Sequence, residues 1–368
     1  MVIIAAFLAM TPYVQGQETV TIQFSRSALE AKWQARIQSF LDRGVIPLID
    51  MQSSLKGRQG DSFPEDAITA MDELGIALIV FDGRQAKRRS SEQRGYRWGY
   101  FIHELVNAFP GRFVLATNGG TNKNWIRNKN SFINQLETQI QSGVYSLIGE
   151  IDFRHYMSKR QCRDGRTDRD LDKPLDGDHG RRVVELSAQT GVAMVIHLEP
   201  EDAPLAALEK MLEAYPKAKI VVAHFGQIRH PDRQSKFGPG LVRRLLTNYP
   251  NLYYDLSVGR PGRTYKCNND VLDTVIWQDG DYGQQKDVLK PEYKKILTEF
   301  STRFVVGFDY GGGRGPLAYF FERRAAIARL IQRDLPEQAR RNISYRNAWR
   351  ILTGRAWTDS GRKGKSAP

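Results

Sequence analysis

Eight short apolar runs, rich in β-branched residues and each ending in a polar residue, constrain the fold of this sequence more than any other feature. They cover residues 45–50, 76–82, 113–117, 145–150, 192–197, 219–224, 252–257 and 304–309. Helix-like stretches, often closed by Gly or Pro, lie between them at residues 63–74, 98–109, 132–142, 180–190, 203–215, 241–249 and 290–300. Strands that alternate with helices form a parallel sheet, so this pattern predicts an α/β fold of the (β/α)8 TIM-barrel type.

The length and composition fit one large α/β domain or two smaller ones, and they exclude a small disulfide-stapled module. The chain has 368 residues, of which 41% are hydrophobic and 26% charged, which is enough to fill a large core. A doubly wound sheet would usually carry Gly-x-Gly-x-x-Gly after its first strand, and none follows residues 45–50. We expect the barrel to span residues 45–353, with an N-terminal extension at 17–44 and a disordered tail at 354–368.

Residues 1–16 have the pattern of a secretory signal peptide. An apolar run from Val2 to Met10 is too short to span a bilayer, and Val14-Gln15-Gly16 has the small-residue pattern of a cleavage site. No Lys or Arg precedes the run, so a miscalled start codon or a buried N-terminal strand stays open. The sequence predicts export to the periplasm or the medium, and no later run is long enough to predict a membrane span.

The formal net charge of +13 raises the question of an anionic partner. Basic residues gather in two loop-like segments, 84–97 and 154–182, which form either an ordinary solvated surface or the rim of a site for an anion. The sequence has no continuous basic stripe with interleaved aromatic residues, which argues against nucleic acid. We therefore expect a small anionic substrate; the oligomeric state is left open.

Polar residues cluster at the C-terminal ends of the predicted strands. They are Asp50, Glu150, His197, His224, Asp255 and Asp309. A barrel of this type builds its active site at that end, from the loops that follow the strands. The longest loops are 152–179 and 258–290, and each holds one cysteine, Cys162 or Cys267. A disulfide between these loops and two unpaired thiols are both open.

The strand ends Gly-Glu-Ile-Asp-Phe (149–153), Val-Ile-His-Leu-Glu (195–199), Val-Val-Ala-His-Phe-Gly-Gln (221–227) and Gly-Phe-Asp-Tyr-Gly (307–311) resemble the amidohydrolase superfamily, in particular its amidohydrolase-related and TatD-like branches. The resemblance covers about residues 45–353 and includes the closing segment at 346–352. It implies a metal-dependent hydrolase. In that reading Glu150, His197 and His224 are metal ligands, and Asp309 both binds metal and takes the proton of the metal-bound water.

One part of the sequence departs from the family pattern. The family has Asp-x-His-x-His at the end of the first strand, where this chain has Asp50-Met51-Gln52-Ser53-Ser54. Gln52 and Ser54 are weak ligands for a transition metal, so we expect them to contact substrate instead. The remaining His₂-carboxylate set suits one divalent ion, with zinc the first expectation and manganese or iron as alternatives.

Arginines near the strand ends are the candidates for holding an anionic substrate. They are Arg154, Arg260, Arg263 and Arg314, which follow the fourth, seventh and eighth strands. The leading hypothesis is hydrolysis of a small anionic ester, lactone, amide or phosphoester by metal-activated water. The main alternative is a degenerate barrel that binds an anionic ligand or polymer. A decarboxylase and a TatD-like nuclease rank lower, and a single strand-end His is more often structural than a ligand.

Overall fold

The computed structural model describes residues 21–55, 63–83, 102–119, 123–233, 236–265, 267, 271–272, 274–278, 288–311 and 316–358. Its strands are β1 (Leu48–Leu55), β2 (Ile76–Gly83), β3 (Phe113–Ala116), β4 (Ile148–His155), β5 (Leu171–Asp172), β6 (Met194–Leu198), β7 (Ile220–Val222), β8 (Leu252–Asp255), β9 (Thr264–Tyr265), β10 (Val271–Leu272) and β11 (Phe304–Val305). The predicted 1–16 signal segment and Arg314 lie outside the described residues.

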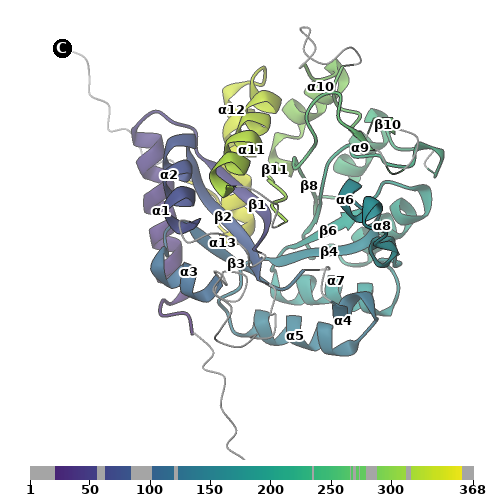
Figure 1. The fold of residues 1–368 in the computed structure, drawn as a ribbon, viewed down its shortest axis with the longest axis horizontal. Helices are drawn as coiled ribbons and strands as arrows, with labels where there is room; N and C mark the ends of the chain where they lie inside the picture. The colour runs from purple at the N-terminus through teal and green to yellow at the C-terminus, as the bar shows by residue number, and fades with distance from the viewer. Residues whose placement is uncertain are drawn as a thin grey trace, which may run out of the picture.

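Helices follow the strands and surround them (Figure 1). They are α1 (Arg26–Asp42), α2 (Phe63–Leu74), α3 (Ile102–Ala108), α4 (Lys123–Ile126), α5 (Asn130–Gln141), α6 (Lys159–Arg163), α7 (Asp178–Thr190), α8 (Asp202–Ala214), α9 (Pro239–Asn248), α10 (Pro291–Glu299), α11 (Leu317–Gln332), α12 (Glu337–Arg341) and α13 (Asn347–Thr353). Local signals set several ends: Pro239 and Pro291 begin α9 and α10, and Gly191 ends α7 with φ 71°.

Parallel strands close into a ring in the described part of the chain. One sheet has the order β1-β2-β3, and the other has the order β11-β8-β7-β6-β4-β5. The bridge between Ala116 and Leu147 joins β3 to the start of β4, and the bridge between Asp50 and Val306 joins β1 to the end of β11. With the antiparallel strand β5 left out, eight parallel strands form this ring. The predicted (β/α)8 barrel is therefore confirmed.

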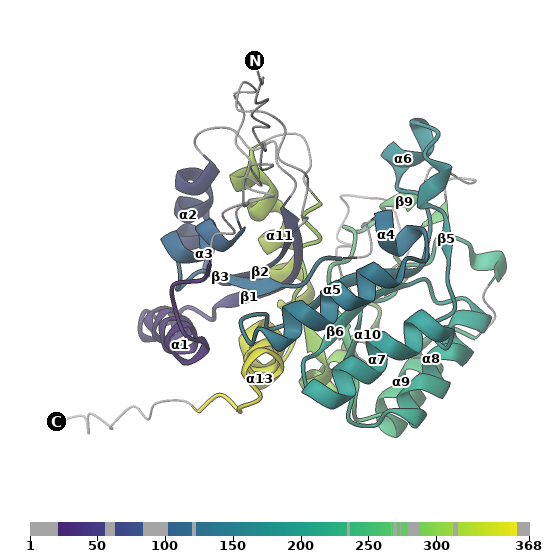
Figure 2. The ribbon, with the colours of Figure 1, turned by 90° about the horizontal axis from the view of Figure 1, so that it is seen from below.

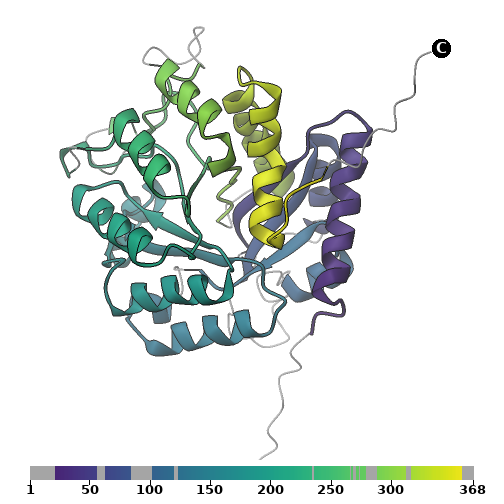
Figure 3. The same cartoon turned by 180° about the vertical axis from the view of Figure 1, so that it is seen from behind.

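The strands are buried on both faces, which explains why they read as continuous apolar runs in the sequence. Every residue of β3, β6, β7 and β8 is buried. Helix α1, in the segment predicted as an N-terminal extension, adds Leu29, Trp33, Ile37 and Phe40 to the same core. Figure 3 shows α1 beside the C-terminal helices, and the Arg26 side chain there contacts the Leu352 carbonyl oxygen. Trp357, in the predicted tail, packs edge-on against Tyr345 and Trp349.

Strand boundaries differ from the sequence prediction where the site is built. β4 starts at Ile148 and runs to His155, so Glu150 lies inside the strand and not at its end. The reason is tertiary, because residues 154–155 pair with the short antiparallel strand β5. In Figure 2, α6, β5 and β9 project together, away from α7, α8 and α9. Among the described residues, no helix is long and apolar enough to cross a membrane.

Candidate metal centre

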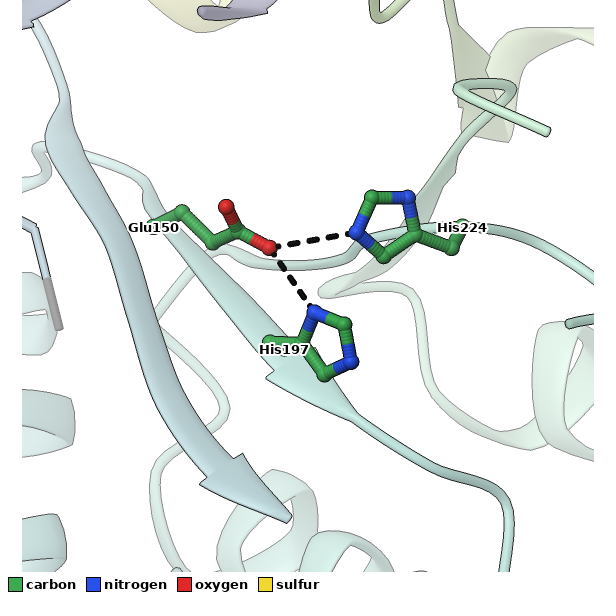
Figure 4. Close-up of side chains that lie close together, drawn as sticks. All are labelled: Glu150, His197 and His224. Atoms are coloured by element: carbon green, nitrogen blue, oxygen red, sulfur yellow. Dashed lines mark hydrogen bonds and ion pairs between the residues drawn. The ribbon is translucent and has the colours of Figure 1, made fainter. Parts of the chain in front are cut away.

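Glu150, His197 and His224 converge on one point of the barrel (Figure 4). The Glu150 Oε1 atom lies 3.0 Å from His197 Nδ1 and 3.3 Å from His224 Nε2. One ligand atom from each residue lies within 4.8 Å of the other two. Both imidazoles are buried, and the Glu150 side chain keeps 18% of its surface exposed. Three of the four predicted metal ligands therefore meet.

The barrel brings these three side chains together from separate parts of the sequence. β4 and β6 are neighbours, and in their register Asp152 lies opposite His197. His224 follows β7, which pairs with β6. Its backbone has a φ of 59°, a conformation that is uncommon for residues other than glycine. A hydrogen bond of 2.8 Å from the His224 amide to Asp255 Oδ1 holds it there.

The contacts with Ser257 determine which ring nitrogen of His224 carries a proton. His224 Nδ1 lies 3.1 Å from the Ser257 carbonyl oxygen and 2.7 Å from its Oγ. A carbonyl oxygen only accepts, so Nδ1 carries the proton in that hydrogen bond. The Nε2 atom facing Glu150 then has either a second proton or a lone pair available to a metal. The Ser257 contact thus orients His224 as a metal ligand needs.

The electrostatics of the site favour positive charge between the carboxylate and the two rings. Burial would lower the pKa of His224, but Glu150 and the nearby carboxylates Asp309 and Asp255 raise it to about 9. The pKa of His197 is raised too, because the Glu150 and Glu199 hydrogen bonds outweigh burial. Burial would raise the pKa of Glu150, yet its hydrogen bonds with His197 and His224 hold it well below the ordinary value.

These residues fit a divalent metal. Two imidazoles and one carboxylate form a common zinc-binding set, and tetrahedral bonds of about 2.1 Å place ligand atoms about 3.4 Å apart. The distances of 3.0 and 3.3 Å between Glu150 and the two histidines are close to that spacing. A bound metal ion would replace the protons that the two histidines hold because of their raised pKa values.

A second group, missed in the sequence, adjoins the first. Asp152, His155 and His197 also place one ligand atom each within 4.8 Å of one another, and all three are buried. The His155 ring lies 4.5 Å from the His197 ring, and His155 Nδ1 donates to the Arg169 carbonyl oxygen at 2.7 Å. Burial lowers the pKa of His155 to about 3, so the ring is neutral. In the sequence, the only signal for His155 is its position in the run 149–155, which also contains Glu150.

Asp309, the fourth predicted ligand, lies outside both groups in the described part of the chain. It follows β11 by four residues, has a φ of 53°, and keeps 42% of its side chain exposed. Its Oδ2 atom lies 3.7 Å from Arg324 Nη2. Its charge still reaches His224, whose pKa it helps to raise. The structure therefore places Asp309 beside the group formed by Glu150, His197 and His224 and not within it, and metal binding by Asp309 stays a prediction.

The first-strand residues Gln52 and Ser54 belong to β1. Gln52 is 5% exposed, and its Oε1 atom has no hydrogen-bond partner among the described residues. Its carbonyl oxygen accepts from the Asp309 amide at 2.8 Å, and the Ser54 amide donates to the Tyr310 carbonyl oxygen at 2.5 Å. These contacts connect the first strand to the segment that carries Asp309. Substrate contact by Gln52 or Ser54 stays a prediction.

The predicted arginines occupy different environments. Arg154 is 2% exposed, and its guanidinium donates to Asp170 at 2.8 Å and to Glu201 at 3.1 Å. The sequence predicts that Arg154 follows the fourth strand and lies at the open mouth of the barrel. The structure corrects this expectation, because the side chain is buried and paired with two carboxylates. Its position within β4 is the physical reason. Arg260 and Arg263 are exposed, and their role in holding substrate stays a prediction.

The two cysteines, predicted in separate loops, lie beside each other. Cys162 is in α6 and Cys267 follows β9, and both are partly buried free thiols. A hydrogen bond between the two thiols contributes to a raised pKa of Cys162. Cys267 Sγ also lies 3.8 Å from the Met157 carbonyl oxygen. The structure thus brings the two predicted loops into contact at these thiols.

Comparison with solved structures gives matches of low sequence identity. A 2,6-dihydroxybenzoate decarboxylase from Rhizobium is 10% identical with a TM-score of 0.47, covering 83% of this chain and 98% of that one. A dihydroorotase from Campylobacter jejuni is 14% identical with a TM-score of 0.46, covering 83% and 82%. An amidohydrolase 2 from Bifidobacterium longum subsp. infantis is 12% identical with a TM-score of 0.44, covering 83% and 98%. A search of curated proteins found no match.

The scan against family models matches residues 161–353 to the amidohydrolase family. This segment includes His197, His224 and Asp309, and it ends with α13. Glu150 lies before it, on the strand next to that of His197. Because the match covers more than half of the chain, the protein belongs to the amidohydrolase family.

Proposed function

We propose that this protein is a metal-dependent hydrolase that acts on a small anionic ester, lactone, amide or phosphoester. The observation that carries the proposal is the convergence of Glu150, His197 and His224 at 3.0 and 3.3 Å, partly open to solvent through Glu150. Membership of the amidohydrolase family supports it. Zinc is the ion that this donor set suits best, with manganese and iron as alternatives.

In this proposal Glu150, His197 and His224 hold one divalent ion. When bound, such an ion polarises a carbonyl or phosphoryl oxygen and lowers the pKa of water to about 7. The chain's own residues do the rest. Ser257 keeps the proton of His224 on Nδ1, and Asp255 fixes the backbone of both residues through hydrogen bonds of 2.8 and 2.9 Å.

Asp309 is our candidate for the general base. It is a half-exposed carboxylate close enough to His224 to raise the pKa of that ring. A carboxylate at the edge of the site can accept a proton from water and return it to a leaving group. Arg324 Nη2 lies 3.7 Å from Asp309 Oδ2 and places a positive charge beside this carboxylate. The exposed Arg260 and Arg263 are candidates to hold the anionic end of the substrate.

Metal content tests the proposal first. We expect about one equivalent of zinc, manganese or iron by plasma mass spectrometry, lost in His197→Ala and in His224→Ala. The matched control is His179→Ala, because His179 is bonded to Asn130 at the start of α5, outside both groups. Retention of metal in both site variants, or no metal even after incubation with excess ion, contradicts the proposed centre.

The second candidate function is binding of an anionic ligand without turnover. The replacement of the two first-strand histidines by Gln52 and Ser54 favours it. A screen of lactones, esters and phosphoesters on metal-loaded protein separates the two readings. Turnover that is lost in Asp309→Asn supports the hydrolase, whereas saturable binding of an anion without turnover supports the binding protein. Release of CO₂ or cleavage of oligonucleotides in the same screen would identify the decarboxylase or nuclease alternative.

A further inference from the structure

Two buried arginines lie next to the metal centre and were not among the predicted site residues. Arg169 belongs to the short 3₁₀ turn Thr167–Arg169 between α6 and β5, and Arg229 lies between β7 and α9. They are 5% and 6% exposed. Arginine is almost never buried to this extent unless its donors are satisfied.

Each guanidinium has a carboxylate partner but also keeps donors without one. Arg169 Nη2 donates to Asp152 Oδ2 at 2.5 Å, while its Nε and Nη1 atoms have no partner among the described residues. Arg229 Nη1 lies 3.1 Å from Glu199 Oε1 and 3.3 Å from the Tyr156 carbonyl oxygen, and its Nε atom has no partner in that same part of the chain. Leaving such donors unpaired in the interior costs free energy, and the cost is larger for a charged group than for a neutral one.

Both guanidinia are connected to the candidate metal centre through their carboxylate partners. Asp152, the partner of Arg169, forms one group with His155 and His197, and Glu199 Oε1, the partner of Arg229 Nη1, lies 3.4 Å from His197 Nε2. The His155 ring lies 4.5 Å from the His197 ring, and Asp152 and Glu199, the two carboxylate partners, also lie next to His197. The unpaired donors therefore lie one side chain away from the site of the proposed chemistry.

We propose that Arg169 and Arg229 form a subsite that binds a carboxylate group of the substrate beside His155. This inference rests on the proposed function, because it names the part of the substrate that the same site recognises. A carboxylate brings two acceptor oxygens, and charge-assisted hydrogen bonds from guanidinium groups are the strongest that it can accept in a protein.

The test is binding of malonate, a small dicarboxylate, measured by isothermal titration calorimetry on the protein as purified and after removal of metal by a chelator. The variants are Arg169→Lys and Arg229→Lys, which keep the charge opposite Asp152 and Glu199 but remove the Nε donor. The matched control is Arg36→Lys, because Arg36 pairs with Asp72 and contacts Ala77 at the start of β2, the other end of the barrel.

We expect malonate to bind with and without metal, and its affinity to fall about tenfold or more in each site variant but not in Arg36→Lys. Affinities within twofold of the wild type in either site variant would overturn the subsite, as would no saturable binding at about 50 mM. Circular dichroism checks that the variants fold. If one does not, the double variant Glu199→Gln with Arg229→Gln removes both buried charges together and must show the same loss.

The same preparations separate this proposal from the proposed function. Arg-dependent malonate binding in protein that never acquires metal supports the subsite and contradicts the hydrolase. If the protein binds one equivalent of metal and malonate affinity is unchanged in both arginine variants, the result supports the hydrolase centre and overturns the subsite. Binding that disappears only when the metal is removed assigns the anion to the metal and also overturns the subsite.

Discussion

At the scale of single residues, the candidate site depends on backbone and side-chain contacts that orient His224. His224 has a positive φ of 59°, which costs free energy that its surroundings must offset. Asp255 Oδ1 accepts hydrogen bonds from the amides of His224 and Ser257, and Ser257 in turn contacts His224 Nδ1. Partners of this kind fix the tautomer and the orientation of a metal-binding imidazole.

Ser257→Ala tests this orientation. The variant loses the Oγ contact with His224 Nδ1 at 2.7 Å but keeps the carbonyl contact at 3.1 Å. We expect the metal affinity to fall about tenfold, the low end of the effect of removing such a partner. Competition with a chelating dye measures it. Ser142→Ala is the control, since Ser142 only caps the end of α5, and an equal loss in both variants would contradict the assigned role.

The lowered pKa of Glu199 predicts a specific dependence of the free energy of unfolding on pH. Burial would raise its pKa, but Arg229 and the hydrogen bond with His197 lower it to about 2. Because this lies below the ordinary value of 4.5, ionised Glu199 stabilises the fold above pH 4.5, and that contribution is lost as the pH falls towards 2.

We expect the free energy of unfolding of the wild type to exceed that of Glu199→Gln by about 3 kcal/mol at pH 6. The excess should shrink as the pH falls below 4.5. Urea denaturation at pH 6, 4.5 and 3 measures it, and Glu137→Gln, on the partly exposed surface of α5, is the control. A difference that stays constant or grows in acid would show that Glu199 is not ionised in the folded protein.

At the scale of elements, the length of β4 shapes the site. The strand was predicted to end at Glu150, yet it continues to His155 because residues 154–155 find hydrogen-bond partners in β5. This extension carries Asp152 and His155 along the strand, and α6 lies near β9 (Figure 2). Tyr265 Oη donates to the Met157 carbonyl oxygen at 2.8 Å, which holds the two loops together next to Cys162 and Cys267.

We predict that Cys162 and Cys267 form a disulfide in an oxidising medium. Oxidised glutathione would take up the two thiol protons and two electrons as two molecules of reduced glutathione. Peptide mapping should find the crosslinked peptide and no free thiol. Closing a loop of about 100 residues should raise the free energy of unfolding by up to about 4 kcal/mol, an effect absent in Cys162→Ser. Mixed disulfides with glutathione at both positions would contradict the pairing.

At the scale of the whole molecule, the barrel includes helix α1, although the sequence placed it in an extension. Trp33 is 1% exposed and belongs to the core cluster that also contains the strands. Arg26 and Glu30 of α1 contact the C-terminal segment through Leu352 and Arg355. The N-terminal helix thus packs against the end of the same domain.

Trp33→Ala tests whether α1 belongs to the folding unit. Removing a buried Trp leaves a cavity, and we expect the free energy of unfolding to fall by about 3–5 kcal/mol in one cooperative transition. Urea denaturation followed by circular dichroism measures it, with Gln34→Ala on the exposed face of α1 as the control. A two-step transition, with the barrel as stable as in the wild type, would show that α1 is a separate appendage.

The sequence by itself determined the eight strands, the order of the helices, the barrel class and the family, because apolar periodicity and the residues that end strands are local properties. It also determined that Glu150, His197 and His224 should meet, since parallel strands present their ends at one face. Only the tertiary structure decided that β4 runs on to His155, that Arg154 is buried in ion pairs, and that Asp309 stands apart from the candidate ligand group. It also paired Arg169 with Asp152 and Arg229 with Glu199, because the contacts of loop residues depend on partners distant in sequence and carry no periodic signal.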